Sequence, residues 1–234
     1  MTSWDEIESS AEAFGLVTRG GFSVAADDEF LGDRLTGNTG ALVLLGNVGD
    51  SYWKEFSKSP EYLDGGEDPL DRWSRRVLDK LAFDLGAMAL FPFDGPPYFP
   101  FQRWAAQAEP LNPSPLGLYI SPQFGVWHAF RGALLFDRSV DLPAAVSGQS
   151  PCISCEDRPC LITCPVGAFS NDGYDVNACF EHISSDPNRT CLEGGCQARL
   201  ACPAGGDYVY GQNQMRFLMG AFEKARKKAA ENGN

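Results

Sequence analysis

All eight cysteines of this 234-residue chain lie between Pro151 and Pro203, and this segregation constrains the chain more than any other feature. The segment opens with PCISCEDRPCLITCP and closes with CFEHISSDPNRTCLEGGCQARLACP, so each half ends in a Cys-Pro pair. Thiols gathered in one part of an otherwise cysteine-free chain are typical of a metal or cofactor site. We therefore expect two sets of four cysteine ligands.

The composition is that of a folded, water-soluble protein. Hydrophobic residues make up 44% of the chain and aromatic residues 12%, which is enough for a packed core. The chain has no run of 18 apolar residues and the amino terminus MTSWDEIESS lacks signal-peptide features, so we expect a cytoplasmic protein without membrane contact. A reducing cytoplasm favours metal ligation over disulfide bonds. The net charge of −12 argues against a nucleic-acid partner and suits a redox protein that docks on a basic partner.

Hydrophobic periodicity predicts a mixed α and β domain ahead of the cysteines. Ser3 has the position of a helix cap. The apolar run ALVLLGN, residues 41–47, is typical of a strand buried on both faces. Asp68 is the expected N-cap of a helix over residues 69–85, and Gly86 is its expected end.

The rest of the chain adds further strands, a loop and a linker. MALFPF indicates a strand, FDGPPYFPFQRW a rigid loop, and LGLYIS and FGVWHAFRGALLF two strands joined by a turn at Pro122. SVDLPAAVSGQSP has the composition of a linker, so we expect domains at 1–145 and 146–234. The expected fold is an α/β (α+β) domain, then a small cysteine-rich domain that ends in a helix over about residues 212–230.

The cysteine spacing favours iron–sulfur clusters. Residues between successive cysteines number two, four and three in the first set, and eleven, four and five in the second. The bacterial ferredoxin run has gaps of two, two and three before Cys-Pro, so the first set is a lengthened form of it. Iron in a sulfide-bridged cluster prefers sulfur donors, and a four-iron cluster takes four of them.

In two-cluster ferredoxins the fourth cysteine of each run ligates the other cluster. The alternative is two structural zinc sites, although zinc sites usually present a C-x2-C pair in each half and show no preference for proline after the last ligand. On the ferredoxin pattern, one [4Fe-4S] cluster is assigned to Cys152, Cys155, Cys160 and Cys202, and the other to Cys164, Cys179, Cys191 and Cys196.

The segment PLGLYISPQFGVWHAFRGALLF resembles one found in cobalamin-processing proteins of the CblC type, in epoxyqueuosine reductases and in reductive dehalogenases. The carboxyl part is similar to the dicluster ferredoxin domain of the last two families. The resemblance implies a modified nitroreductase-like domain that holds a corrinoid (cobalamin) in place of flavin, followed by a ferredoxin-like domain whose clusters reduce it.

The resemblance also implies roles for individual residues. Phe124, Gly125 and Trp127 match the family segment and are the expected corrinoid contacts. Asp94, in FDGPP, resembles the acid that serves as proton donor in epoxyqueuosine reductases, with a turn-forming role as the alternative. The Gly-Trp-x-Gly-Lys stretch of those enzymes is missing where AEPLNPSPLG stands, which argues against queuosine maturation.

Neither histidine is expected to bind metal. His128 alternates with apolar residues on a strand face and is expected to be a hydrogen-bonded core residue. His182 follows Cys179 by three residues and is expected at a solvated position, with a place beside a cluster as the alternative.

Three functions follow from these features. The first is a corrinoid-linked reductase, an oxidoreductase whose clusters reduce a cofactor or substrate in the front domain, with a redox protein or a corrinoid protein as partner. The second is a ferredoxin-like electron carrier whose front domain docks on a partner. The third is an FMN-dependent enzyme of the nitroreductase type.

Overall fold

The computed structural model describes residues 2–144 and 147–231. The chain forms two compact units: the first contains Met1–Pro110 and His128–Gly148, and the second contains Leu111–Trp127 and Gln149–Asn234. The expected boundary between residues 145 and 146 lies outside the described residues. The units do not coincide with the expected domains, because Leu111–Trp127 packs with the cysteine-rich part of the chain.

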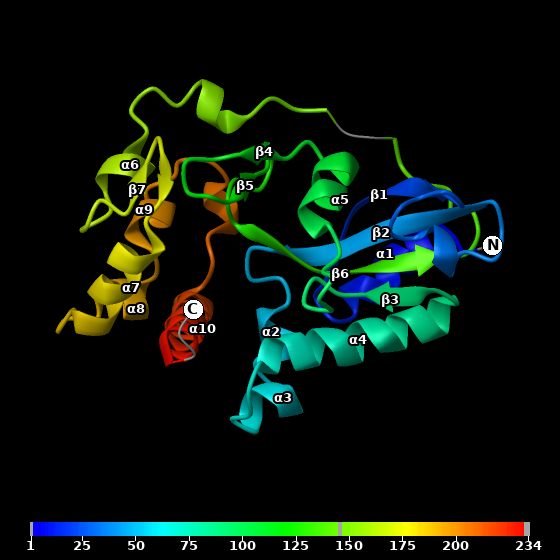
Figure 1. Ribbon diagram of the computed structural model, residues 1–234, viewed down its shortest axis with the longest axis horizontal. Helices are drawn as coiled ribbons and strands as arrows, with labels where there is room; N and C mark the ends of the chain where they lie inside the picture. The colour runs from blue at the N-terminus through cyan, green and yellow to red at the C-terminus, as the bar shows by residue number, and fades with distance from the viewer. Residues whose placement is uncertain (1, 145–146, 232–234) are drawn as a thin grey trace. The chain divides into compact units, whose positions relative to one another are not determined.

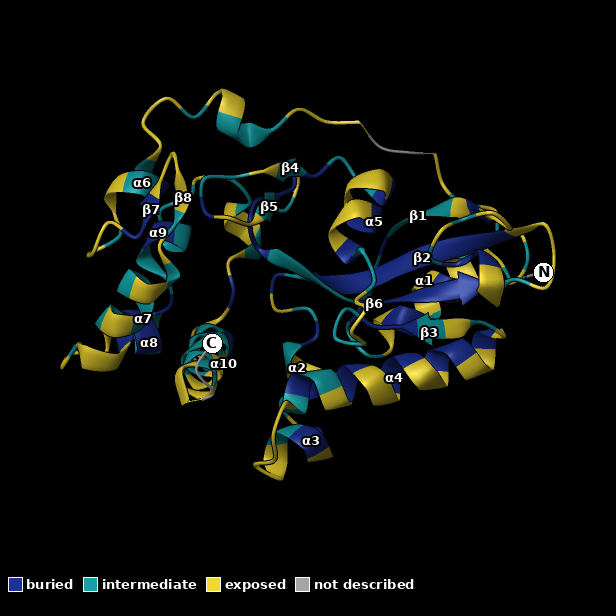
Figure 2. Cartoon of the chain, viewed as in Figure 1, coloured by how far each residue is buried: buried dark blue, intermediate teal, exposed yellow. Residues whose placement is uncertain are grey.

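The first unit is built on a four-stranded antiparallel sheet with strand order β1-β2-β6-β3. The strands are β1 (Val17–Ala25), β2 (Thr39–Val48), β3 (Met88–Leu90) and β6 (His128–Phe136). Strand β2 is buried along almost its whole length, as Figure 2 shows. The expected strand buried on both faces is therefore confirmed, since a central strand covered on both sides has only apolar surroundings.

Helices cover both faces of this sheet (Figure 1). Helix α4 (Pro69–Leu85) packs on β3 and β6, α1 (Trp4–Glu12) packs on β1 and α4, and α5 (Phe101–Ala108) packs on β1. Short segments complete the unit: η1 (Gly32–Arg34), α2 (Trp53–Phe56) and α3 (Pro60–Leu63). The architecture is thus a mixed α and β fold with antiparallel sheets.

The helix ends follow local sequence with one exception. The Ser3 hydroxyl accepts a hydrogen bond of 3.2 Å from the backbone N–H of Glu6, which satisfies a free amide at the start of α1. Gly86 ends α4 at a φ of 62°, a conformation that favours glycine. Asp68 is the N-cap residue of α4 as expected, but its backbone is left-handed and its side chain makes no capping hydrogen bond.

Two further predictions are corrected in this region. The expected rigid loop FDGPPYFPFQRW includes the start of α5, which buries Phe101, Trp104, Ala105 and Ala108 at helical spacing. The expected pairing of LGLYIS with the following strand is also wrong. Strand β5 (Tyr119–Ile120) pairs with β4 (Asn112–Pro113), and β6 starts only at His128.

The second unit consists of short elements and one long helix. These elements are β4, β5, η2 (Pro151–Ile153), α6 (Pro159–Ile162), β7 (Phe169–Ser170), β8 (Gly173–Tyr174), α7 (Val176–Ser185), α8 (Thr190–Gly194), α9 (Gln197–Leu200), η3 (Gly206–Tyr208) and α10 (Gln212–Glu231). Its core joins Ile120, Val126 and Trp127 to Phe169 and Tyr210. Cys160 belongs to this core, and Cys152, Cys164, Cys196 and Cys202 pack against it. Within the described residues, no helix is both long and apolar enough to cross a bilayer.

Candidate metal centre

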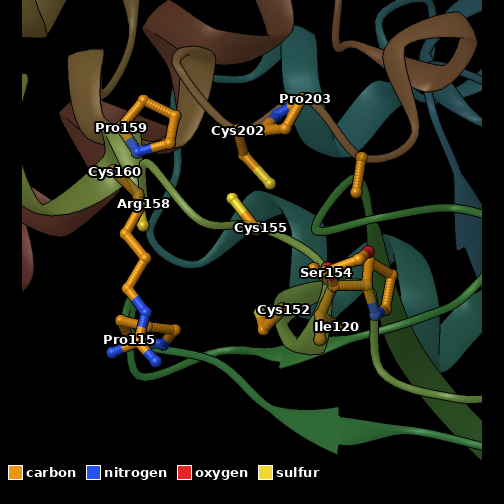
Figure 3. A pocket seen from close by; sticks show the side chains of 12 residues that line it. Pro115, Ile120, Cys152, Ser154, Cys155, Arg158, Pro159, Cys160, Cys202 and Pro203 are labelled. Carbon is orange, nitrogen blue, oxygen red and sulfur yellow. The ribbon is translucent and has the colours of Figure 1, made fainter.

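Four cysteines from separate elements surround one cavity in the second unit. Its volume is about 310 Å³, and Cys152, Cys155, Cys160 and Cys202 lie in its wall. Figure 3 shows Cys155, Cys160 and Cys202 with their sulfur atoms directed toward the same space. Prolines and Ile120 form much of the remaining wall, so the cavity is largely apolar.

Local chain geometry places these cysteines. The Ser150 hydroxyl accepts a hydrogen bond of 3.3 Å from the backbone N–H of Cys152, which starts the η2 turn. Arg158 takes a left-handed backbone with a φ of 40°, and Pro159 after it begins α6, which carries Cys160. Proline is well suited to the first turn of a helix because its missing N–H has no partner there.

The other four cysteines form a second group. Burial raises the pKa of the Cys191 thiol, and the neighbouring thiolates of Cys196, Cys179 and Cys164 raise it further. Burial likewise raises the pKa of Cys196, with contributions from Cys179 and Cys164. These four side chains therefore lie within electrostatic reach of one another, although they come from α7, α8 and the ends of α6 and α9.

The thiols of the first group also influence one another electrostatically. Burial raises the pKa of the Cys160 thiol, and the thiolates of Cys202, Cys152 and Cys155 add to the effect. Thiolate is the form that binds metal, so such a site gains its ligands by releasing protons when the metal enters.

Backbone amides point at sulfur in both groups. The N–H of Ala168 donates to Cys164 Sγ at 3.3 Å. The backbone N–H of Ala204 donates to Cys202 and lowers the pKa of that thiol against the opposing effect of burial. Amides that donate to sulfur stabilise negative charge on a cluster and are a main control of its potential. The donor set therefore fits two four-cysteine clusters.

The choice between zinc and iron–sulfur clusters stays a prediction for metal analysis to test. Across residues 2–144 and 147–231, no group of three or more His, Cys, Asp or Glu side chains is placed to hold a single metal ion.

The predicted corrinoid contacts lie in the second unit and pack there. Trp127 is only 1% exposed, and its ring lies 5.3 Å from that of Tyr210. Gly125 has a φ of 57°, and a Cβ added there would lie 2.0 Å from the carbonyl oxygen of Ala204. Phe124 contacts Tyr208 edge to face, with a centroid distance of 5.0 Å. The segment thus anchors the chain that follows Cys202, and contact with a corrinoid stays a prediction.

Replacing Gly125 with alanine tests this anchoring. A left-handed backbone costs a non-glycine residue about 1–2 kcal/mol, and the new methyl group would collide with Ala204. We expect a lower free energy of unfolding and a lower iron content. Gly167→Ala is the matched control, because Gly167 has a similar φ of 59° but no atom within 4 Å of the added Cβ. Equal losses in the two variants would contradict the anchoring role.

The remaining candidate residue, Asp94, belongs to the first unit. The Asp94 carboxylate forms an ion pair with Arg75, and both side chains are exposed, by 39% and 45%. The Arg75 guanidinium also covers the ring of Phe91 at 4.4 Å. A proton-donating role for Asp94 stays a prediction.

The structure bears differently on the predictions for the two histidines. His128 Nδ1 lies 3.3 Å from Arg19 Nη2, so the expected hydrogen bond of His128 is confirmed, but the side chain is half-buried and not part of the core. His182 is not the solvated side chain that was expected, since its Nε2 is buried without a hydrogen-bond partner in the described part of the chain.

Sequence reasoning missed Arg199, which stands between Cys196 and Cys202 in the chain. Its guanidinium lies 4.7 Å from the ring centroid of Trp127 and 4.5 Å from that of Tyr210. The one available signal was a basic residue within the run CQARLAC.

Comparison with known proteins shows the fold. No family model matches the chain, and no curated protein matches it. Three solved structures of epoxyqueuosine reductase do. The first is a complex with a tRNA-Tyr epoxyqueuosine-modified stem loop, with a TM-score of 0.51 and 16% sequence identity over 89% of this chain. The second is a selenomethionine-labelled protein, with a TM-score of 0.51 and 14% identity over 91% of this chain. The third is from Streptococcus thermophilus, with a TM-score of 0.50 and 16% identity over 90% of this chain.

The likeness is one of fold, because sequence identity is low. This chain spans 66% of the length of the first of these structures and 68% of the other two. The expected resemblance to epoxyqueuosine reductases is confirmed at that level. The tRNA stem loop in the first structure conflicts with our expectation that nucleic acid is excluded, so we do not retain that expectation.

Proposed function

We propose that this protein is an iron–sulfur oxidoreductase whose second unit is a ferredoxin-like module with two [4Fe-4S] clusters. The observation that carries the proposal is the separation of eight thiols into two groups of four. Cys152, Cys155, Cys160 and Cys202 share one cavity, and the remaining cysteines lie within reach of one another. Bound in these groups, the clusters would supply one-electron transfer.

The protein's own residues would hold the metal and control its surroundings. The cysteines supply thiolate, and the amides of Ala168 and Ala204 donate to sulfur. Around the second group, α10 contributes Met215 and Leu218 to the apolar packing. An apolar, amide-lined setting of this kind limits water and sets the redox potential.

Metal analysis tests the proposal directly. Protein purified without oxygen is expected to contain about eight iron atoms and about eight acid-labile sulfides per chain, as two four-iron clusters require. It should be brown, and dithionite should bleach it. A colourless protein that contains zinc would defeat the proposal.

The finer proposal is that the first unit is nitroreductase-like and serves reduction of a corrinoid. Its support is the family segment at SPQFGVW and the fold shared with epoxyqueuosine reductase. Gly125 and Trp127 are buried by their own unit, so other residues must supply most of the contacts with such a large cofactor. Asp94 is the proposed proton donor.

Extraction of bound cofactors separates this proposal from its alternatives. A corrinoid in the extract supports the reductase, a flavin supports the nitroreductase type, and iron alone favours an electron carrier. Cobalamin added to the purified protein should change its absorption spectrum as it binds. Failure to bind at micromolar concentration would end the corrinoid proposal.

The redox partner is proposed to be a protein with a basic face. The net charge of −12 favours that choice, because opposite charges speed the encounter of two proteins. Since a structural neighbour is complexed with a tRNA stem loop, RNA belongs among the substrates to be assayed.

A further inference from the structure

Arg199 holds a positive charge beside both cysteine groups. It lies in α9, which is preceded by Cys196 of one group and followed by Cys202 of the other. With Cys196 it lines a small cavity of about 30 Å³. Its charge lowers the pKa of Cys202, against the larger opposing effect of burial. The guanidinium therefore lines a cavity with Cys196 of one group, and its charge reaches Cys202 of the other.

The position of the guanidinium is closely controlled. The rings of Trp127 and Tyr210 lie 4.7 Å and 4.5 Å from its central carbon. Its Nη2 donates a hydrogen bond to the carbonyl oxygen of Val126. A planar guanidinium stacked on aromatic rings is preorganised in a way that a lysine ammonium is not. The charge is thus fixed in place.

In the described part of the chain, no carboxylate pairs with this cation. Among the ion pairs of residues 2–144 and 147–231, none includes Arg199. Its Nε is buried and without a hydrogen-bond acceptor in the described residues, as is the neighbouring Trp127 Nε1. Partly buried cations are normally paired, because leaving water is costly. The anions at hand are the thiolates of the two cysteine groups.

We propose that Arg199 is a positioning residue that raises the reduction potentials of the redox groups held by the cysteines. The inference rests on the proposed iron–sulfur function. Reduction by one electron adds negative charge, and a fixed positive charge nearby favours the reduced form. A merely structural Arg199 would hold the 121–127 segment in place without changing the potentials.

The test is a redox titration of the iron-loaded protein with dithionite, followed by electron paramagnetic resonance. Arg199→Gln removes the charge, and we expect the reduction equilibrium of at least one cluster to become about tenfold less favourable, which is 59 mV for one electron. Arg199→Lys keeps a charge and should shift less. Lys227→Gln is the charge-matched control, because Lys227 is 55% exposed and paired with Glu223.

The potentials of the variants distinguish an electrostatic role of Arg199 from a structural one. Unchanged potentials in an iron-loaded Arg199→Gln protein, or equal shifts in the Gln and Lys variants, would overturn the inference. If Arg199→Gln fails to hold iron, the Tyr210→Leu variant is tested instead. It removes one of the two rings beside the guanidinium and should lower the reduction potential. An unchanged potential in Tyr210→Leu would overturn the inference. Absence of iron from the wild-type protein would defeat the proposed function and this inference with it.

Discussion

Replacing Cys202 with serine is expected to remove one cluster and leave the other. Cys202 shares a cavity with Cys152, Cys155 and Cys160, although 41 residues lie between it and the last of these. Loss of one thiolate ligand opens a four-iron cluster, so the iron content should fall to about half of the wild-type value. Iron and sulfide analysis of protein purified without oxygen measures the effect.

Double variants distinguish our assignment, in which Cys202 completes the first cluster, from a sequential one, in which Cys164 completes it. Cys152→Ser and Cys202→Ser act on the same proposed cluster, so their combination should lose no more iron than either alone. Cys152→Ser combined with Cys164→Ser acts on both clusters and should lose nearly all of it. If this second pair retained half of the iron, the sequential assignment would be correct and ours wrong.

The second large effect is expected in the first unit, at the buried ion pair of Arg19 and Glu109. The Arg19 side chain is 1% exposed. Its Nε and Nη2 donate hydrogen bonds of 2.5 and 2.6 Å to the carboxylate of Glu109. The guanidinium also covers the ring of Phe130 at 4.7 Å. Glu109→Ala would leave a buried charge without its carboxylate, which typically costs about 3–5 kcal/mol.

Urea unfolding monitored by circular dichroism measures this loss. Asp84→Ala is the control, because its pair with Lys80 is solvent-exposed and worth at most about 0.5 kcal/mol. The double variant Arg19→Met with Glu109→Leu should recover most of the lost stability, since it removes both charges. A loss in Glu109→Ala no larger than that in Asp84→Ala would show that the pair contributes little.

Local features were predicted where nearby residues decide the structure. The apolar run in β2, the serine at the start of α1 and Gly86 at the end of α4 each act within a few residues. Helix α5 was missed although Phe101, Trp104, Ala105 and Ala108 have helical spacing, because the surrounding prolines and aromatic residues favoured a loop.

The sequence by itself determined which thiol ligands are available for the proposed clusters, because the number and spacing of cysteines are properties of residue type and order. Only the tertiary structure decided the placement of Leu111–Trp127. Gly125 fits closely against Ala204 and Trp127 contacts Tyr210 edge to face. These contacts join residues about 80 positions apart that no local pattern links. The same long-range packing holds the guanidinium of Arg199 against the ring of Trp127.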